Sequence, residues 1–175
     1  MKKHLLTFII PLLLVCGAAQ AKDGFETVRC GGDIPRALTG VRTNNEPVVA
    51  TEARHKALAL KDLGGDEISD NLSSVEWSIC GGEYMTLVDT HGMVTDAIAV
   101  LPQPSKTTPE FAAGVCKLNG KDTTGGWIVA VLDNSAGGNA PLLPAKSAWR
   151  INEKTNKFEP LPMTGLLCPR DGALP

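Results

Sequence analysis

Four widely spaced cysteines constrain the fold of this chain more than any other feature. Cys30, Cys80, Cys116 and Cys168 are 50, 36 and 52 positions apart. A zinc site or a thioredoxin-like redox centre needs closely spaced pairs of the Cys-x-x-Cys type, so this spacing argues against both. In an oxidising compartment, an even number of cysteines indicates structural disulfides, here two. Three pairings are possible, and we favour Cys30–Cys168 with Cys80–Cys116, because the first bond would hold both ends of the chain.

The N-terminus predicts export to such a compartment. Residues 2–4 are basic, residues 5–15 are almost entirely apolar, and residues 19–21 supply the small side chains that a signal peptidase reads. We therefore expect a secretory signal peptide over residues 1–21, removed by cleavage before Lys22. The apolar stretch is too short to cross a hydrocarbon core of about 30 Å at about 1.5 Å per residue. A lipoprotein acylated at Cys16 is disfavoured, because the preceding valine is not small.

Size and charge narrow the function of the remaining chain. Residues 22–175 have the length of a single domain. The net charge falls from −2 to −4 once Lys2 and Lys3 are removed, and aromatic residues make up only 5% of the chain. A chain without a basic stripe and with few aromatic residues is not expected to bind nucleic acid. Beyond the signal no apolar run is long enough to span a membrane.

One segment, residues 51–63, has the composition of an amphipathic helix. Thr51 can cap its N-terminus, good helix formers fill it, and Gly64 follows it. The apolar residues on its buried face would be Ala53, Ala57, Leu60 and Leu63. The preceding residues, 22–49, have no periodicity and are expected to be irregular.

Most of the other periodic segments are typical of strands. Between residues 74 and 101, apolar and polar residues alternate in three runs separated by the short turns Cys80-Gly81-Gly82 and Thr90-His91-Gly92. Trp77 belongs to the buried side of the first run, whereas Glu76 and Glu83 are expected to face water. Residues 126–133 predict a buried strand, residues 134–144 a long loop, and residues 148–161 a hairpin. We predict an α+β domain: an antiparallel β-meander sheet with one amphipathic helix, tied by two disulfides.

Several of these motifs are shared with other proteins. They are the Lys-Asp-Leu-Gly-Gly sequence from Lys61, the segments Ile79-Cys80-Gly81 and Glu83-Tyr84-Met85 after Trp77, the hairpin from Trp149 to Thr155, and the tail Cys168-Pro169-Arg170. In these motifs the chain resembles an uncharacterised group of small exported proteobacterial proteins over most of its mature length. The resemblance implies export and a shared fold, and it implies no activity.

No motif dictates a reaction. Neither a Gly-x-Ser-x-Gly elbow nor a phosphate-binding Gly-x-x-x-x-Gly-Lys loop occurs, and the mature chain has only two histidines, His55 and His91. Asp89, His91 and Asp96 lie close in sequence, and an aspartate can orient a catalytic imidazole, as a small hydrolase would need. The composition of residues 89–92 is equally that of a hairpin turn, which is the interpretation we favour.

The same turn raises the question of a metal. His91, Met93 and Met85 offer the imidazole and thioether groups that suit Cu(I), with His55 as the only further histidine. Methionines are more often core residues. We therefore predict no metal and no cofactor.

A small, disulfide-tied, exported domain without a catalytic constellation is more often a binding protein than an enzyme. We expect a periplasmic or secreted protein-interaction module of the inhibitor or immunity type, whose partner is an envelope or extracellular protein. Its candidate contact loop is Thr90, His91 and Gly92, with the long loop 134–144 as a second surface. The alternatives are a periplasmic metal or small-ligand binder and a small hydrolase that uses Asp89 and His91.

Overall fold

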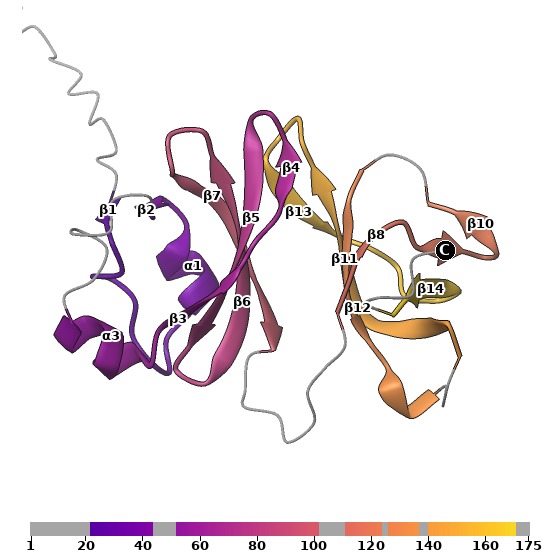
Figure 1. The fold of residues 1–175 in the computed structure, drawn as a ribbon, viewed down its shortest axis with the longest axis horizontal. Helices are drawn as coiled ribbons and strands as arrows, with labels where there is room; N and C mark the ends of the chain where they lie inside the picture. The colour runs from indigo at the N-terminus through magenta and orange to yellow at the C-terminus, as the bar shows by residue number, and fades with distance from the viewer. Residues whose placement is uncertain (1–21, 44–51, 102–110, 124–125, 137–139, 171–175) are drawn as a thin grey trace, which may run out of the picture.

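The structure is a computed structural model that describes residues 22–43, 52–101, 111–123, 126–136 and 140–170. The predicted signal peptide, residues 1–21, and the predicted cap Thr51 lie outside this part. Antiparallel β-sheet dominates it, and helices are few and short (Figure 1).

The first sheet grows from a tight hairpin. Cys80 and Gly81 both have positive φ, at 55° and 82°, as a two-residue turn between antiparallel strands requires. This turn joins β5 to β6, and a second turn joins β6 to β7. The strand order is β3-β5-β6-β7, with β4 also pairing with β5. The strands are β3 (Lys61–Gly64), β4 (Glu67–Ser69), β5 (Leu72–Ile79), β6 (Gly82–Asp89) and β7 (Val94–Leu101).

The second sheet curls around a single long strand, β12 (Leu142–Asn152). Its C-terminal part pairs with β11 and β13, whereas its first residues pair with β14, so the order is β10-β9-β14-β12-β11-β8 with β13 beside β12. The other strands are β8 (Phe111–Gly114), β9 (Lys117–Leu118), β10 (Lys121–Asp122), β11 (Ile128–Leu132), β13 (Lys157–Pro160) and β14 (Leu166–Pro169). A short 3₁₀ helix, η1 (Asn134–Ala136), follows β11.

Three apolar clusters hold these layers together. The middle cluster lies between the two sheets and contains Leu72, Leu87, Val129, Ile151 and Phe158. The N-terminal cluster covers the other face of the first sheet with residues from the segments 24–43 and 52–60. The C-terminal cluster lies where β9 and β14 fold over the second sheet. Each sheet therefore carries an apolar cluster on both of its faces.

The predicted alternation of side chains along β5 and β6 is confirmed. The face that was expected to be exposed to water, however, is largely covered. Trp77 is 7% exposed and lies in the N-terminal cluster with Tyr84 and Val88, whereas Leu87 lies in the middle cluster. Glu76 and Glu83, expected to face water, are half-buried. The prediction of a sheet with one solvated face was wrong, because the distant second sheet covers it.

The predicted helix over residues 51–63 is much shorter, and its buried face was assigned wrongly. Helix α3 (Glu52–Leu58) ends before Ala59, which has a φ of 45°. Leu58 is the buried residue, Leu63 is 46% exposed, and Ala53 and Ala57 are exposed as well. Residues 61–64 pair with β5 instead, so tertiary pairing overrides their local helix preference.

A second helix lies in the segment that we expected to be irregular. Helix α1 (Ile34–Leu38) begins where the Asp33 carboxylate accepts a hydrogen bond from Arg36 N, and it buries Ile34 and Leu38. Asp33 followed two residues later by Pro35 is an N-terminal helix signal that the periodicity did not reveal. On either side of α1, β1 (Lys22–Asp23) and β2 (Val41–Arg42) pair in parallel.

All four cysteines form disulfides, but the pairing that we favoured was wrong. The bonds are Cys30–Cys80 and Cys116–Cys168, with Cα–Cα distances of 5.5 and 4.3 Å. The first joins the N-terminal segment to the β5–β6 turn, and the second joins β14 to the residue before β9. Each bond closes within one half of the chain because each half has its own apolar cluster.

The predicted long loop over 134–144 is also only partly a loop. Strand β12 begins at Leu142, and Leu143 is fully buried in the C-terminal cluster. Within the described ranges, no helix is long and apolar enough to cross a bilayer.

Candidate functional site

The turn at Thr90, His91 and Gly92 is built around the carboxylate of Asp89. Asp89 Oδ1 accepts hydrogen bonds from His91 N and Met93 N, both at 2.9 Å. Gly92 N donates to Asp89 O at 2.9 Å, and Gly92 has a φ of 72°. This is a closed turn in which the aspartate replaces a backbone acceptor, as turn residues of this type commonly do.

The N-terminal segment fastens this turn from the other side. Thr43 N donates to Gly92 O at 2.9 Å, and Arg42 forms an isolated antiparallel bridge with Met93. Gly92 is buried under these contacts, whereas Thr90 and His91 are exposed. The turn is therefore held rigidly and presents two side chains to the surroundings.

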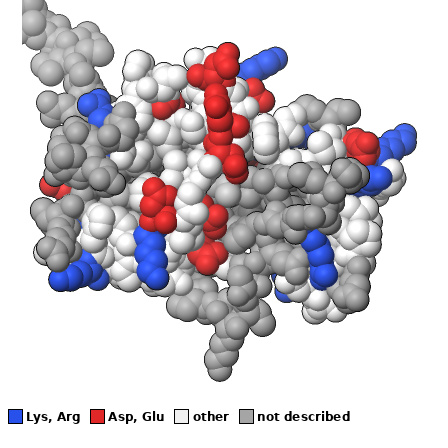
Figure 2. All heavy atoms as spheres, viewed as in Figure 1, with Lys and Arg blue, Asp and Glu red and all other residues white. Residues whose placement is uncertain are grey.

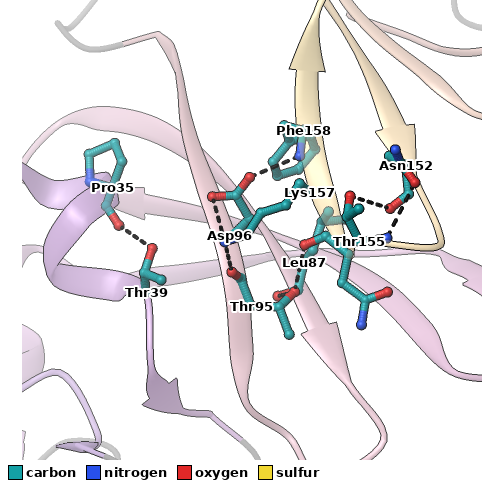
Figure 3. A network of polar contacts seen from close by, with 10 residues as sticks. Pro35, Thr39, Leu87, Thr95, Asp96, Asn152, Thr155, Lys157 and Phe158 are labelled. Carbon is teal, nitrogen blue, oxygen red and sulfur yellow. Dashed lines mark hydrogen bonds and ion pairs between the residues drawn. The ribbon is translucent and has the colours of Figure 1, made fainter.

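The structure places Asp96 in a different network from Asp89 and His91. Asp96 lies on β7, where one carboxylate oxygen accepts from Phe158 N at 2.9 Å and the other is 3.6 Å from Lys157 Nζ (Figure 3). Asp89 is occupied by the backbone of its own turn. The carboxylates of Asp89 and Asp96 thus have separate structural partners.

The Asp96 network joins the two sheets, and the sequence analysis missed it. The Thr95 hydroxyl donates to Asn156 O at 3.1 Å, and Lys157 Nζ donates to Thr95 O at 2.6 Å. Together with the Asp96 contacts, they hold the edge of β7 against β13. At this point neither β7 nor β13 therefore has an open edge. The available signal was an aspartate inside a strand whose other residues are apolar except for Thr95, since a partly buried carboxylate needs a hydrogen-bond donor.

The methionines and histidines considered for copper lie apart. The residue opposite Met85 is Ile98, so Met93 is not its neighbour across the hairpin. Met93 O instead accepts from Asp89 N, and Asp89 is four residues, or about 13 Å, along the strand from Met85. His55 is exposed on α3. In the described part of the chain, no group of three or more His, Cys, Asp or Glu side chains could hold a metal ion.

The second candidate surface can be followed only at its base, because residues 137–139 lie outside the described ranges. Asp133 Oδ1 accepts from the Ser135 hydroxyl at 2.6 Å and lies 3.2 Å from Lys146 Nζ. The Ser135 hydrogen bond, and then the hydrogen bond from Lys146, holds the pKa of Asp133 below its ordinary value. The carboxylate therefore stays ionised and anchors the base of this loop to β12.

A hollow that the sequence did not reveal lies beside β3 and β4. It has a volume of about 340 Å³ and is lined by backbone and side chains of Asp62, Gly64, Gly65, Asp66, Glu67, Ser73, Ser74 and Val75. Figure 2 shows Asp and Glu side chains gathered along the middle of this face of the molecule. Gly65 is required here, because a Cβ would come within 2.0 Å of Ser74 O.

Comparison with known proteins adds no relative: no family model, no curated protein and no solved structure matches this chain.

Proposed function

We propose that this protein is exported through its N-terminal signal and that its folded domain binds another protein of the envelope or the extracellular space, as an inhibitor or immunity protein does. The Thr90–His91–Gly92 turn is the contact surface. The resemblance to small exported proteobacterial proteins agrees with the export half of the proposal, and so do the two disulfides, since such bonds persist in oxidising compartments.

The observation that carries the binding half is the fixed geometry of the turn. Asp89 and Thr43 hold its backbone from two sides, while Thr90 and His91 are exposed. A loop that is already ordered loses little conformational entropy when it binds, so its contacts contribute more fully to affinity.

Capture from an envelope extract tests the contact surface. We would immobilise the mature protein, the double variant Thr90→Ala/His91→Ala, and the control variant Glu153→Ala/Lys154→Ala, which changes another exposed turn. We expect one protein to be retained by the wild type and by the control but lost from the Thr90/His91 variant. Equal capture by all three proteins would contradict the assignment of the turn.

Export is tested separately by mass spectrometry of the protein from the cell envelope. The expected N-terminus is Lys22. A chain that begins at a lipid-modified Cys16, or an intact Met1 in the cytoplasm, would contradict this part of the proposal.

A further inference from the structure

The two edges of the first sheet differ in how they are covered. At the β7 edge, Asp96 and Thr95 make three contacts with β13 and one with Asn156, directly before it, so β13 blocks the addition of another strand. The other edge consists of β3 and β4, which both pair with β5 on their inner side. Among the described strands, none pairs with their outer side. This edge is therefore open within the described part of the chain.

The open edge is acidic. Asp62, Asp66, Glu67 and Asp70 lie along it or at its turn and are all exposed, and Lys61 is the one basic residue between positions 61 and 71. Asp96, Asp122 and Asp133 form ion pairs elsewhere in the described part of the chain. Asp62 also accepts a hydrogen bond from Gly64 N at 2.9 Å, which shapes the bulge within β3 between Asp62 and Gly64.

This charge pattern decides which strand the edge can accept. A second copy of the same edge would place carboxylates opposite carboxylates, which is unfavourable across paired strands. Open edges in natural proteins commonly carry charge and bulges for this reason. An extended segment with basic side chains would instead meet opposite charge, and its backbone could pair with the free side of β3 or β4.

Two further features fit such a segment. Leu63 is 46% exposed on β3 and offers one apolar contact. The hollow beside Asp66 and Glu67 has room for an extended lysine or arginine side chain, whose charged group would lie among the carboxylates. Both features lie next to the open edge.

We propose that the β3–β4 edge binds an extended basic segment of a partner protein by strand addition. This inference rests on the proposed function in one respect, namely that the partner is a protein. The β3–β4 edge and the Thr90–Gly92 turn are separate surfaces, so the two assignments can be tested separately. Backbone hydrogen bonds provide the pairing, and the carboxylates select the basic sequence.

The test uses the mature protein and a fluorescein-labelled heptapeptide of alternating lysine and valine, followed by fluorescence anisotropy. We expect saturable binding, and at least about tenfold weaker binding of a peptide with the same charges but N-methyl groups on alternate residues, since methylation removes the donors that pair with the edge. Equal binding of both peptides would show a purely electrostatic contact and would overturn strand addition.

A pair of matched variants tests the position. Asp66→Asn/Glu67→Gln and Glu26→Gln/Asp122→Asn each remove two exposed carboxylates, but only the first pair lies at the edge. We expect about tenfold weaker peptide binding for the edge variant and less than twofold for the control, with unchanged Tm for both. Equal weakening would overturn the assignment of the edge.

The envelope capture experiment separates this inference from the proposed function. A captured protein that is lost from the edge variant and kept by the Glu26/Asp122 control supports the inference. A protein that is lost only from the Thr90/His91 variant leaves the proposed function standing and overturns the role of the edge.

Discussion

Each half of the molecule is closed by one disulfide, and the two bonds lie in contrasting surroundings. Cys116 and Cys168 are 1% and 0% exposed and belong to the C-terminal cluster itself. Cys30 is exposed and Cys80 is half-buried, so their bond lies at the outside of the N-terminal cluster. The C-terminal bond is thus a core element, whereas the N-terminal bond fastens a covering layer from outside.

This difference follows from how each half covers its sheet. In the C-terminal half the cover is made of strands β9 and β14, which continue the sheet and bring the cysteines inside. In the N-terminal half the cover is made of loops and the short helices α1 and α3. These segments contain few backbone hydrogen bonds of their own. A cover of this kind depends more on side-chain packing, of which the edge-to-face contact between Phe25 and Trp77, 5.0 Å between ring centroids, is one example.

The largest effect should come from removing the buried disulfide. Cys116→Ser/Cys168→Ser loses the cross-link and leaves two hydroxyls in an apolar cluster, so we expect a loss of about 5 kcal/mol or more. The control Cys116→Ala/Cys168→Ala should lose less, because alanine buries no polar group. Chemical denaturation measures both, and equal losses would contradict a core role for this bond.

Trp77→Ala should have the next largest effect. It removes a large buried side chain of the N-terminal cluster and its hydrogen bond from Nε1 to the Thr86 hydroxyl at 3.3 Å, so we expect a loss of about 3–5 kcal/mol. Trp77→Phe, which keeps most of the packing, should lose clearly less in the same denaturation experiment. A loss below about 1 kcal/mol for alanine would show that this cluster is loosely packed.

Removing the exposed disulfide should cost about 2–4 kcal/mol, the usual range for a cross-link without further burial. Cys30 is accessible to reductant, so limited dithiothreitol followed by alkylation should label Cys30 and Cys80 first. Peptide mass spectrometry identifies the labelled cysteines. Labelling of Cys116 and Cys168 at the same rate would remove the contrast between the two halves.

Asp96→Ala tests how firmly the two halves are joined. It leaves Phe158 N without its acceptor and removes the ion pair with Lys157, so we expect a loss of about 1–2 kcal/mol. The control Asp122→Ala breaks an exposed ion pair of 3.9 Å with Lys117 and should change stability by about 0.5 kcal/mol or less. Similar small effects at both sites would show that the Figure 3 network is energetically dispensable.

The smallest effect is expected at His91. Its side chain is exposed, and alanine keeps the backbone N–H that donates to Asp89 Oδ1, so His91→Ala should change stability by about 0.5 kcal/mol or less. Copper or zinc should not raise the Tm of either protein. A metal-dependent rise in Tm that disappears in the variant would favour the metal-binding alternative, since a ligand of the folded state stabilises it.

Local patterns predicted the strands well and the helices poorly. The alternation around Trp77 and the glycine-containing turns correctly placed β5, β6 and β7, because a strand in a hairpin is specified by residues that are near one another in sequence. Residues 61–64 follow a helix-forming segment but pair with β5, and nothing within residues 61–64 indicates the pairing. The Asp89 turn was predicted from its composition, whereas the Asp96 contact with Phe158, 62 residues away, was not.

By themselves, the residues of this chain determined that four cysteines would pair, that hairpins would form an antiparallel sheet, and that Trp77 would lie in a core. These are consequences of local chemistry: thiol spacing, turn geometry and the two-residue period of a strand. Only the tertiary structure decided which cysteines pair, which face of each strand meets the second sheet, and which edge of the first sheet has no partner strand among the described residues. Such features depend on contacts between segments far apart in sequence. The burial of apolar surface drives these contacts, and because it is non-directional, the sequence of one segment does not specify which other segment it will contact.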